Sequence, residues 1–187
     1  MIEVEIRAGV NSFDEIKKEL EKIKACYFKS VHQIDKIFGH PMFLDSKNMI
    51  IEGGIVPRIR SVNNKCSLEF KEIRRMSGGI ELKSDIDNIQ EGVDFLKKLG
   101  FSEAFTIDKY REFYKYKDFT ICLDKVDKLG CFIEIEKMIK SAGEEKSVRE
   151  KCVEVLGLIS PDSKIENRKY GDLMQEFINK EQRKGEG

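Results

Sequence analysis

Acidic and basic side chains occupy alternate positions in several segments of this chain, where they could bind metal ions or phosphate groups. The first segment, IEVEIR (residues 2–7), sets Glu3, Glu5 and Arg7 on one side of an extended chain and three apolar residues on the other. The same alternation recurs in VPRIR (56–60), SLEFK (67–71), IELK (80–83), DKYREFY (108–114), FTICLD (119–124) and CFIEIEK (131–137). Most of these polar sides carry ions rather than the Ser, Thr and Gln of a merely solvated sheet.

The ions that share a phase form two sets of opposite charge. The acids are Glu3, Glu5, Glu81, Asp124, Glu134 and Glu136, and the bases are Arg7, Arg58, Arg60, Lys71, Lys109 and Arg111. They could neutralise one another, or hold a polyanion on the bases and a divalent metal on the acids. Carboxylates without His or Cys suit Mg²⁺ or Mn²⁺ rather than zinc, and Arg58 with Arg60 suits bidentate phosphate recognition. The alternative is a sheet whose charged face is simply exposed to water and has no chemical role.

The composition limits the class of protein. The 187 residues fit one domain, and 34 Lys plus Arg balance 34 Asp plus Glu, which argues against a general nucleic-acid binder. The 5 cysteines show no CxxC spacing, so neither structural zinc nor a disulfide framework is expected. Because no long apolar run is present, we expect a soluble, cytoplasmic protein without membrane contact.

Periodicity and turn residues predict a largely antiparallel α+β fold. Helices are expected at residues 13–25, 88–99, 145–156 and about 170–182, and strands at 2–7, 27–38, 55–63, 66–72, 79–86, 103–116, 118–125 and 130–138. Asn11 or Ser12 is the expected N-cap of the first helix, and Gly100 and Gly157 are expected to close the second and third. Residues 62–65 and 115–118 are predicted hairpin turns.

The apolar sides of the strands predict the core. Val4 and Ile6 should lie under helices, because a slip of one residue would send charges into the apolar layer. The phenylalanines Phe28, Phe38, Phe43, Phe101 and Phe105 are expected in the core rather than as platforms for a base. Removing Glu134 or Glu136 should relieve repulsion within an acidic cluster, so stability without metal should hold or rise.

The order EVEIR … QIDKIF … PRIR … LEFK … FTIDKYREFYKYKDFTICLDKVDKLGCFIEIE resembles the CYTH family, the class IV adenylate cyclase and thiamine triphosphatase group of triphosphate tunnel metalloenzymes. The resemblance runs from Met1 to about residue 140. It implies an eight-stranded antiparallel β-barrel that forms a tunnel, with helices packed outside. We therefore expect a single domain over residues 1–180, followed by a frayed tail at 181–187.

The resemblance also implies roles for single residues. Arg7, Arg58, Arg60, Lys71, Lys109 and Arg111 are the expected triphosphate ligands, and Glu3, Glu5, Glu81, Asp124, Glu134 and Glu136 are the expected metal ligands, with Glu81 the weaker one. Glu5, Arg7 and Asp124 are the catalytic candidates. Three departures from the family pattern put substrate and rate in question: Arg7 stands for the usual Lys, Gly79 with Lys83 alters an Arg-x-Glu-x-Glu motif, and Ile37 replaces a frequent Tyr.

The activity implied by the resemblance is metal-dependent chemistry on a triphosphate. The most similar group is class IV adenylate cyclase, which converts ATP to cyclic AMP and pyrophosphate. The alternatives are a tripolyphosphatase or thiamine triphosphatase, and a non-catalytic binder of polyphosphate or nucleotide. The expected cofactor is Mg²⁺ or Mn²⁺, and the expected partner is ATP, tripolyphosphate or thiamine triphosphate. A homodimer is considered, and neither nucleic acid nor membrane is expected.

Overall fold

The computed structural model describes residues 2–63, 65–73 and 81–185, and within these ranges it contains the predicted alternation of strands and helices. The strands are β1 (Ile2–Val10), β2 (Cys26–Gly39), β3 (Ile55–Val62), β4 (Lys65–Glu72), β5 (Glu81–Ile86), β6 (Ser102–Tyr116), β7 (Phe119–Val126) and β8 (Gly130–Ile139). The helices are α1 (Asp14–Lys22), α2 (Ile89–Lys98), α3 (Glu145–Ile159) and α4 (Tyr170–Gly185), with short 3₁₀ turns η1 (Pro41–Phe43) and η2 (Ala142–Glu144). No described helix carries an apolar stretch long enough to cross a bilayer.

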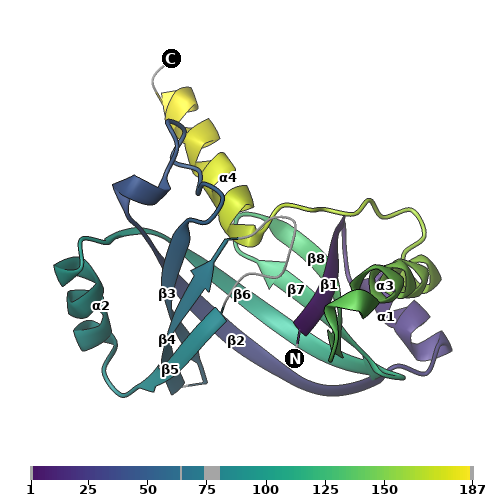
Figure 1. The fold of residues 1–187 in the computed structure, drawn as a ribbon. Helices are drawn as coiled ribbons and strands as arrows, with labels where there is room; N and C mark the ends of the chain where they lie inside the picture. The colour runs from purple at the N-terminus through teal and green to yellow at the C-terminus, as the bar shows by residue number, and fades with distance from the viewer. Residues whose placement is uncertain (1, 64, 74–80, 186–187) are drawn as a thin grey trace. The chain divides into compact units, whose positions relative to one another are not determined.

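The strands hydrogen-bond into one sheet of 8 strands among the described residues, in the order β1-β8-β7-β6-β2-β3-β4-β5 (Figure 1). The β1–β8, β2–β3, β3–β4, β4–β5, β6–β7 and β7–β8 pairs are antiparallel. The predicted α+β class with an eight-stranded antiparallel sheet is therefore confirmed. Hydrogen bonds among the described residues do not close this sheet, because β1 and β5 each have a single neighbour.

The chain divides into two compact units, and each has its own apolar core. Unit 1 comprises Met1–Val31 and Lys109–Asn167, and unit 2 comprises His32–Asp108 and Arg168–Gly187. Single segments contribute to both units because β2 and β6 each continue from one unit into the other. The predicted single domain over 1–180 stays a prediction.

The core of unit 1 fixes the phase of β1. Val4 and Ile6 are 4% and 3% exposed and belong to a cluster with Leu20 of α1 and Leu156 of α3, as predicted. Side chains alternate along a strand, so Glu5 must lie on the opposite face of the sheet. Helices α1 and α3 thus cover the apolar face, and the ions share the other.

Unit 2 has a smaller core between its strands and α2. Phe38 and Ile59 pack with Val93 and Leu96 of this helix. Asn88 caps α2, accepting hydrogen bonds from two backbone N–H groups of the first turn, and Gly100 follows it with a φ of +90°. The predicted start and end of this helix are confirmed.

Several local predictions need comment. The N-cap of α1 is Phe13, with no side-chain cap, rather than Asn11 or Ser12. Gly157 does not end α3, because the helix continues to Ile159, whose side chain is 1% exposed; burial of this residue outweighs the roughly 1 kcal/mol cost of an internal glycine. The two predicted hairpin turns are confirmed by Asn63 and Lys117, which adopt positive φ angles of 47° and 52°. Gly79 lies outside the described residues.

Candidate functional site

Strand register brings the predicted ions of unit 1 together. In the β1–β8 pair, Glu5 lies opposite Glu136 and Arg7 opposite Glu134. Facing residues of antiparallel strands lie about 4.5–5.5 Å apart, so these side chains meet on the polar face. We call Glu3, Glu5, Arg7, Lys109, Arg111, Asp124, Glu134 and Glu136 the unit 1 charge cluster.

Three acids of this cluster have the geometry of a metal site. One carboxylate oxygen from each of Glu5, Glu134 and Glu136 lies within 4.8 Å of the other two. Oxygens bound to one Mg²⁺ at about 2.0–2.1 Å lie about 3 Å apart when adjacent and about 4.2 Å apart when opposite, so the three side chains must rotate toward one another to share an ion. The donors are all hard oxygens, and these residues therefore fit a Mg²⁺ or Mn²⁺ ion.

Two arginines link the acids of the cluster. Arg7 donates from Nε to Glu134 Oε1 at 2.6 Å, and its Nη2 contacts the same oxygen. Arg111 donates from Nη1 to Glu136 Oε1 at 3.1 Å and from Nη2 to Glu134 Oε2. Arg111 also donates two hydrogen bonds to Asp124, with Nε–Oδ1 and Nη2–Oδ2 distances of 2.5 Å each. Arg111 is thus the common partner of three carboxylates.

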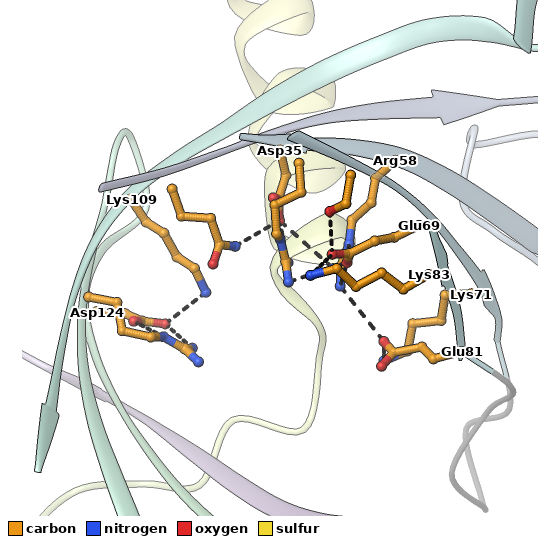
Figure 2. A network of polar contacts seen from close by, with 12 residues as sticks. Asp35, Arg58, Glu69, Lys71, Glu81, Lys83, Lys109 and Asp124 are labelled. Atoms are coloured by element: carbon orange, nitrogen blue, oxygen red, sulfur yellow. Dashed lines mark hydrogen bonds and ion pairs between the residues drawn. The ribbon is translucent and has the colours of Figure 1, made fainter. Parts of the chain in front are cut away.

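Asp124 anchors the two cations of β6. Its side chain is 0% exposed and accepts a hydrogen bond from Lys109 Nζ at 3.2 Å, shown in Figure 2, besides the two from Arg111. A buried carboxylate between a buried and a partly buried cation holds both in fixed positions, because moving either one leaves a charge uncompensated. Asp124 therefore positions Lys109 and Arg111 in this structure.

The two closing glutamates differ in charge state. Burial would raise the pKa of Glu134, but the charges of Arg111 and Arg7 outweigh it and lower that pKa to about 2. Burial raises the pKa of Glu136 to about 7, although Arg111 opposes the shift. Repulsion from Glu134, Glu3 and Glu5 adds to this increase. The cluster contains more acids than bases, and this excess of negative charge contributes to the raised pKa of Glu136.

Unit 2 contains a second cluster with the opposite balance. We call Asp35, Arg58, Arg60, Glu69, Lys71, Glu81 and Lys83 the unit 2 charge cluster. Arg60 donates two hydrogen bonds of 2.7 Å to the carboxylate of Asp35. Arg58 donates a hydrogen bond from Nε to Glu69 Oε2 at 2.7 Å (Figure 2). Gln33 and Ser67 each add one hydrogen bond, of 3.0 Å, to Asp35 and Glu69 respectively.

Two lysines of this second cluster also lie close to its acids. Lys71 Nζ donates to Glu81 Oε1 at 2.8 Å, and Lys83 lies 3.6 Å from Glu69. Partial burial would raise the pKa of Glu81, but the bond from Lys71 and the charge of Arg58 lower it. Arg58, Arg60, Glu69, Glu81, Leu82 and Lys83 line a pocket of about 190 Å³. This volume is below the roughly 300–1,000 Å³ of sites for whole drug-sized ligands.

The structure places the predicted residues in two groups. Glu5, Glu134 and Glu136 converge, and Arg7, Lys109, Arg111 and Asp124 surround them within unit 1. Arg58, Arg60, Lys71 and Glu81 converge in unit 2, where the contacts of Glu81 are with cations. Sequence reasoning missed Asp35 and Glu69 as site residues. Their signal was present, since Asp35 alternates with Gln33, and Glu69 shares a phase with Lys71.

The antiparallel sheet with one ionic face and an apolar face under helices defines an α+β protein whose ions gather on one side of its strands. The chain belongs to the CYTH family, because the model of the CYTH domain matches residues 1–169. A Methanocaldococcus jannaschii protein named "Putative adenylate cyclase" is 31% identical over 161 residues, covering 83% of this chain and 88% of that protein.

Solved structures share the fold. A Pyrococcus horikoshii protein aligns with a TM-score of 0.75 at 28% identity, covering 93% of this chain and 98% of its own. A Hippeastrum protein, described as an adenylyl cyclase with a dominant triphosphatase activity, aligns with a TM-score of 0.65 over 94% of this chain and 95% of its own. At 16% identity, this second likeness shows the fold alone.

Proposed function

We propose that the protein is a metal-dependent enzyme that cleaves a triphosphate, most similar to a class IV adenylate cyclase. The observation that carries the proposal is the convergence of Glu5, Glu134 and Glu136 within 4.8 Å, beside the guanidinium groups of Arg7 and Arg111. Metal-binding oxygens next to cations are the parts that phosphoryl chemistry requires, since it depends mainly on positioning and charge stabilisation. The name of the M. jannaschii relative favours the cyclase.

The unit 1 residues have separate roles in this proposal. Glu5, Glu134 and Glu136 hold Mg²⁺ or Mn²⁺, which when bound orients the phosphates and offsets charge on their oxygens. Arg7 and Arg111 bind phosphate oxygens. Because a guanidinium group stays protonated, Arg7 contributes charge and does not act as a base.

The cations of unit 2 serve as further phosphate ligands in the proposal. Arg58 and Arg60 present planar groups suited to bidentate contacts, and Lys71 and Lys83 add point charges. This cluster has one more base than acids, so an anion is the ligand that its charge favours.

The cyclase reaction needs no covalent intermediate with the protein. The ribose 3′-oxygen forms a bond to the α-phosphorus, the bond to the bridging oxygen breaks, pyrophosphate leaves, and the hydroxyl proton passes to solvent. In the alternative hydrolysis, water forms a bond to the terminal phosphorus, the bond from that phosphorus to the bridging oxygen breaks, the diphosphate part leaves, and orthophosphate is released while a proton passes to solvent. Both reactions use the same binding groups, so the product distinguishes them.

The test is a substrate panel with product analysis. Purified protein is incubated with ATP, tripolyphosphate or thiamine triphosphate, with Mg²⁺, Mn²⁺ or EDTA, and cyclic AMP and orthophosphate are measured. Cyclic AMP formed only with metal supports the cyclase, and orthophosphate assigns the hydrolase. Glu5→Gln should remove activity, whereas Glu15→Gln, which alters an exposed acid of α1, should not. Tight binding without turnover of any substrate would contradict the proposal.

A further inference from the structure

An aromatic pair lies beside the unit 1 charge cluster and has no role in the function proposed above. Phe28 of β2 and Phe113 of β6 have ring centroids 5.7 Å apart with planes tilted by 47°. The sequence predicts Phe28 in the core, but this is wrong, because its side chain is 51% exposed. The first five residues of β2, Cys26–Ser30, are all exposed, so this end of the strand is open to solvent.

The pair is continuous with the cations of the cluster. Phe113 follows Arg111 by two positions on β6, and therefore lies on the same face of the sheet. The Arg111 guanidinium carbon is 5.7 Å from the centre of the Phe113 ring, and Lys29 Nζ is 4.5 Å from it. The same guanidinium group contacts Glu136, a member of the candidate metal site. One arginine thus borders both the carboxylates and the aromatic pair.

The chemistry of this arrangement selects among triphosphates. An isolated exposed phenylalanine needs no explanation. Here, however, an exposed ring packs on a second ring, and that second ring contacts Arg111, a candidate phosphate ligand. A bare polyphosphate chain has no group that would contact it. A planar heteroaromatic ring attached to the phosphates would stack on it, as bases stack on aromatic side chains in nucleic-acid binding proteins.

We propose that Phe28, supported by Phe113, stacks on the heteroaromatic ring of an organic triphosphate. The substrate class is then triphosphates that carry an aromatic ring, with ATP as the probe, and not inorganic polyphosphate. Phe113 holds the Phe28 ring, and Lys29 and Arg111 fix Phe113 through cation–π contacts. This inference rests on the proposed function and names its substrate class.

The test compares two ligands that differ only in the nucleoside. The first is an ATP analogue with methylene groups at both bridging positions, which neither reaction can cleave, and the second is the same phosphonate chain alone. Calorimetric titration with Mn²⁺ gives the ratio of their dissociation constants. The wild type should prefer the nucleoside-bearing ligand. Phe28→Ala should reduce this preference roughly 5- to 150-fold, the equivalent of the about 1–3 kcal/mol measured for stacking of one base.

Two variants serve as controls. Phe28→Tyr keeps the ring and should keep the preference. Tyr27→Ala removes a neighbouring ring that is equally exposed, at 54%, but that packs on Tyr114, 5.6 Å away, instead of Phe113. Its preference should equal that of the wild type, because Tyr114 belongs to the core under the helices.

The outcomes separate this inference from the proposed function. A wild type without preference, or a Phe28→Ala variant whose affinity changes equally for both ligands, overturns the stacking role while leaving triphosphate chemistry intact. A preserved preference without turnover in the substrate panel supports the stacking role and overturns catalysis. A wild type that binds neither ligand overturns both.

Discussion

Glu134 and Glu136 stand two residues apart, yet their substitution by glutamine should have opposite effects on stability without metal. Glu136 is repelled by its acidic neighbours, and its pKa is raised to about 7. Glu134 is held by two arginines, and its pKa is lowered to about 2. We therefore expect Glu136→Gln to stabilise the metal-free protein at alkaline pH and Glu134→Gln to destabilise it at neutral pH.

The magnitude follows from proton linkage. The pKa of Glu136 rises from an ordinary 4.5 to about 7 on folding, so the native state binds the proton more tightly than the unfolded chain. Stability then falls as pH rises from about 4.5 to 7, by at most about 3 kcal/mol, because each pKa unit corresponds to about 1.4 kcal/mol. The side chain is 15% exposed, so solvent screening reduces the full amount only modestly. At pH 8, Glu136→Gln should gain about 2–3 kcal/mol over the wild type, and at pH 4 almost nothing.

The sign is reversed for Glu134. Its lowered pKa contributes stability that is complete above about 4.5 and is lost as pH falls toward 2. Glu134→Gln also leaves Arg7 and Arg111 with fewer partners in a buried site, so the expectation from the sequence that removing Glu134 would hold or raise stability is reversed for this residue. We expect a loss of about 2–4 kcal/mol at pH 7.

Urea unfolding in EDTA, followed by circular dichroism between pH 4 and 8, measures both effects, and Glu15→Gln is the control on an exposed helix. Adding Mg²⁺ should raise the stability of the wild type most at high pH, and that of Glu136→Gln little. If Glu136→Gln is less stable than the wild type at pH 8, then Glu136 is a structural ion-pair partner. The three carboxylates of Glu5, Glu134 and Glu136 would then not form a metal site.

Three further substitutions test other contacts. Glu5→Gln preserves size but removes a ligand charge, so the apparent Mg²⁺ or Mn²⁺ affinity should fall at least tenfold while the melting temperature changes little; unchanged metal dependence in a titration would remove Glu5 from the site. Arg7→Lys keeps the positive charge but loses one of the two hydrogen bonds to Glu134. Activity should therefore persist, and urea unfolding should show a loss of stability of about 1 kcal/mol. Asp35→Asn removes the charge that accepts two bonds from Arg60, while Glu69 stays 3.3 Å from Arg60 Nη1, and should cost about 1–3 kcal/mol in the same assay; a neutral effect would mean that solvent already screens the pair.

The architecture of the sheet could be predicted from the sequence because each strand carries its own evidence. Alternation in IEVEIR fixed which residues of β1 face the helices, since only one phase keeps Val4 and Ile6 dry. Asn88 and Gly100 marked the ends of α2 through backbone requirements that are local. Gly157 failed as an end marker because burial of Ile159, a tertiary effect, outweighed the local preference of glycine.

The alternation of charged and apolar residues could not predict which ions pair with one another in the candidate site. The pattern identifies the face on which an ion lies, whereas its neighbours depend on strand register. Glu134 and Glu136 have the same local sequence context, and only pairing with β1 gives one an arginine and the other a glutamate. Asp35 was overlooked for the same reason, since its pairing opposite Arg60 follows from the β2–β3 register. The exposure of Phe28 follows from its position beside Phe113 on the face that carries the ions, which depends on how β2 pairs with β6.

The pairing of Arg58 and Arg60 with buried carboxylates has a consequence for anion selectivity. Asp35 and Glu69 act as counter-ions tethered to the chain, present at a fixed and high local concentration. A free anion that contacts either arginine must compete with them, so chloride or a single phosphate is at a disadvantage that several linked phosphates can overcome. Because displaced carboxylates stay attached, such binding releases few mobile ions. The affinity for a polyanion should therefore depend on salt less steeply than the number of contacted arginines would suggest.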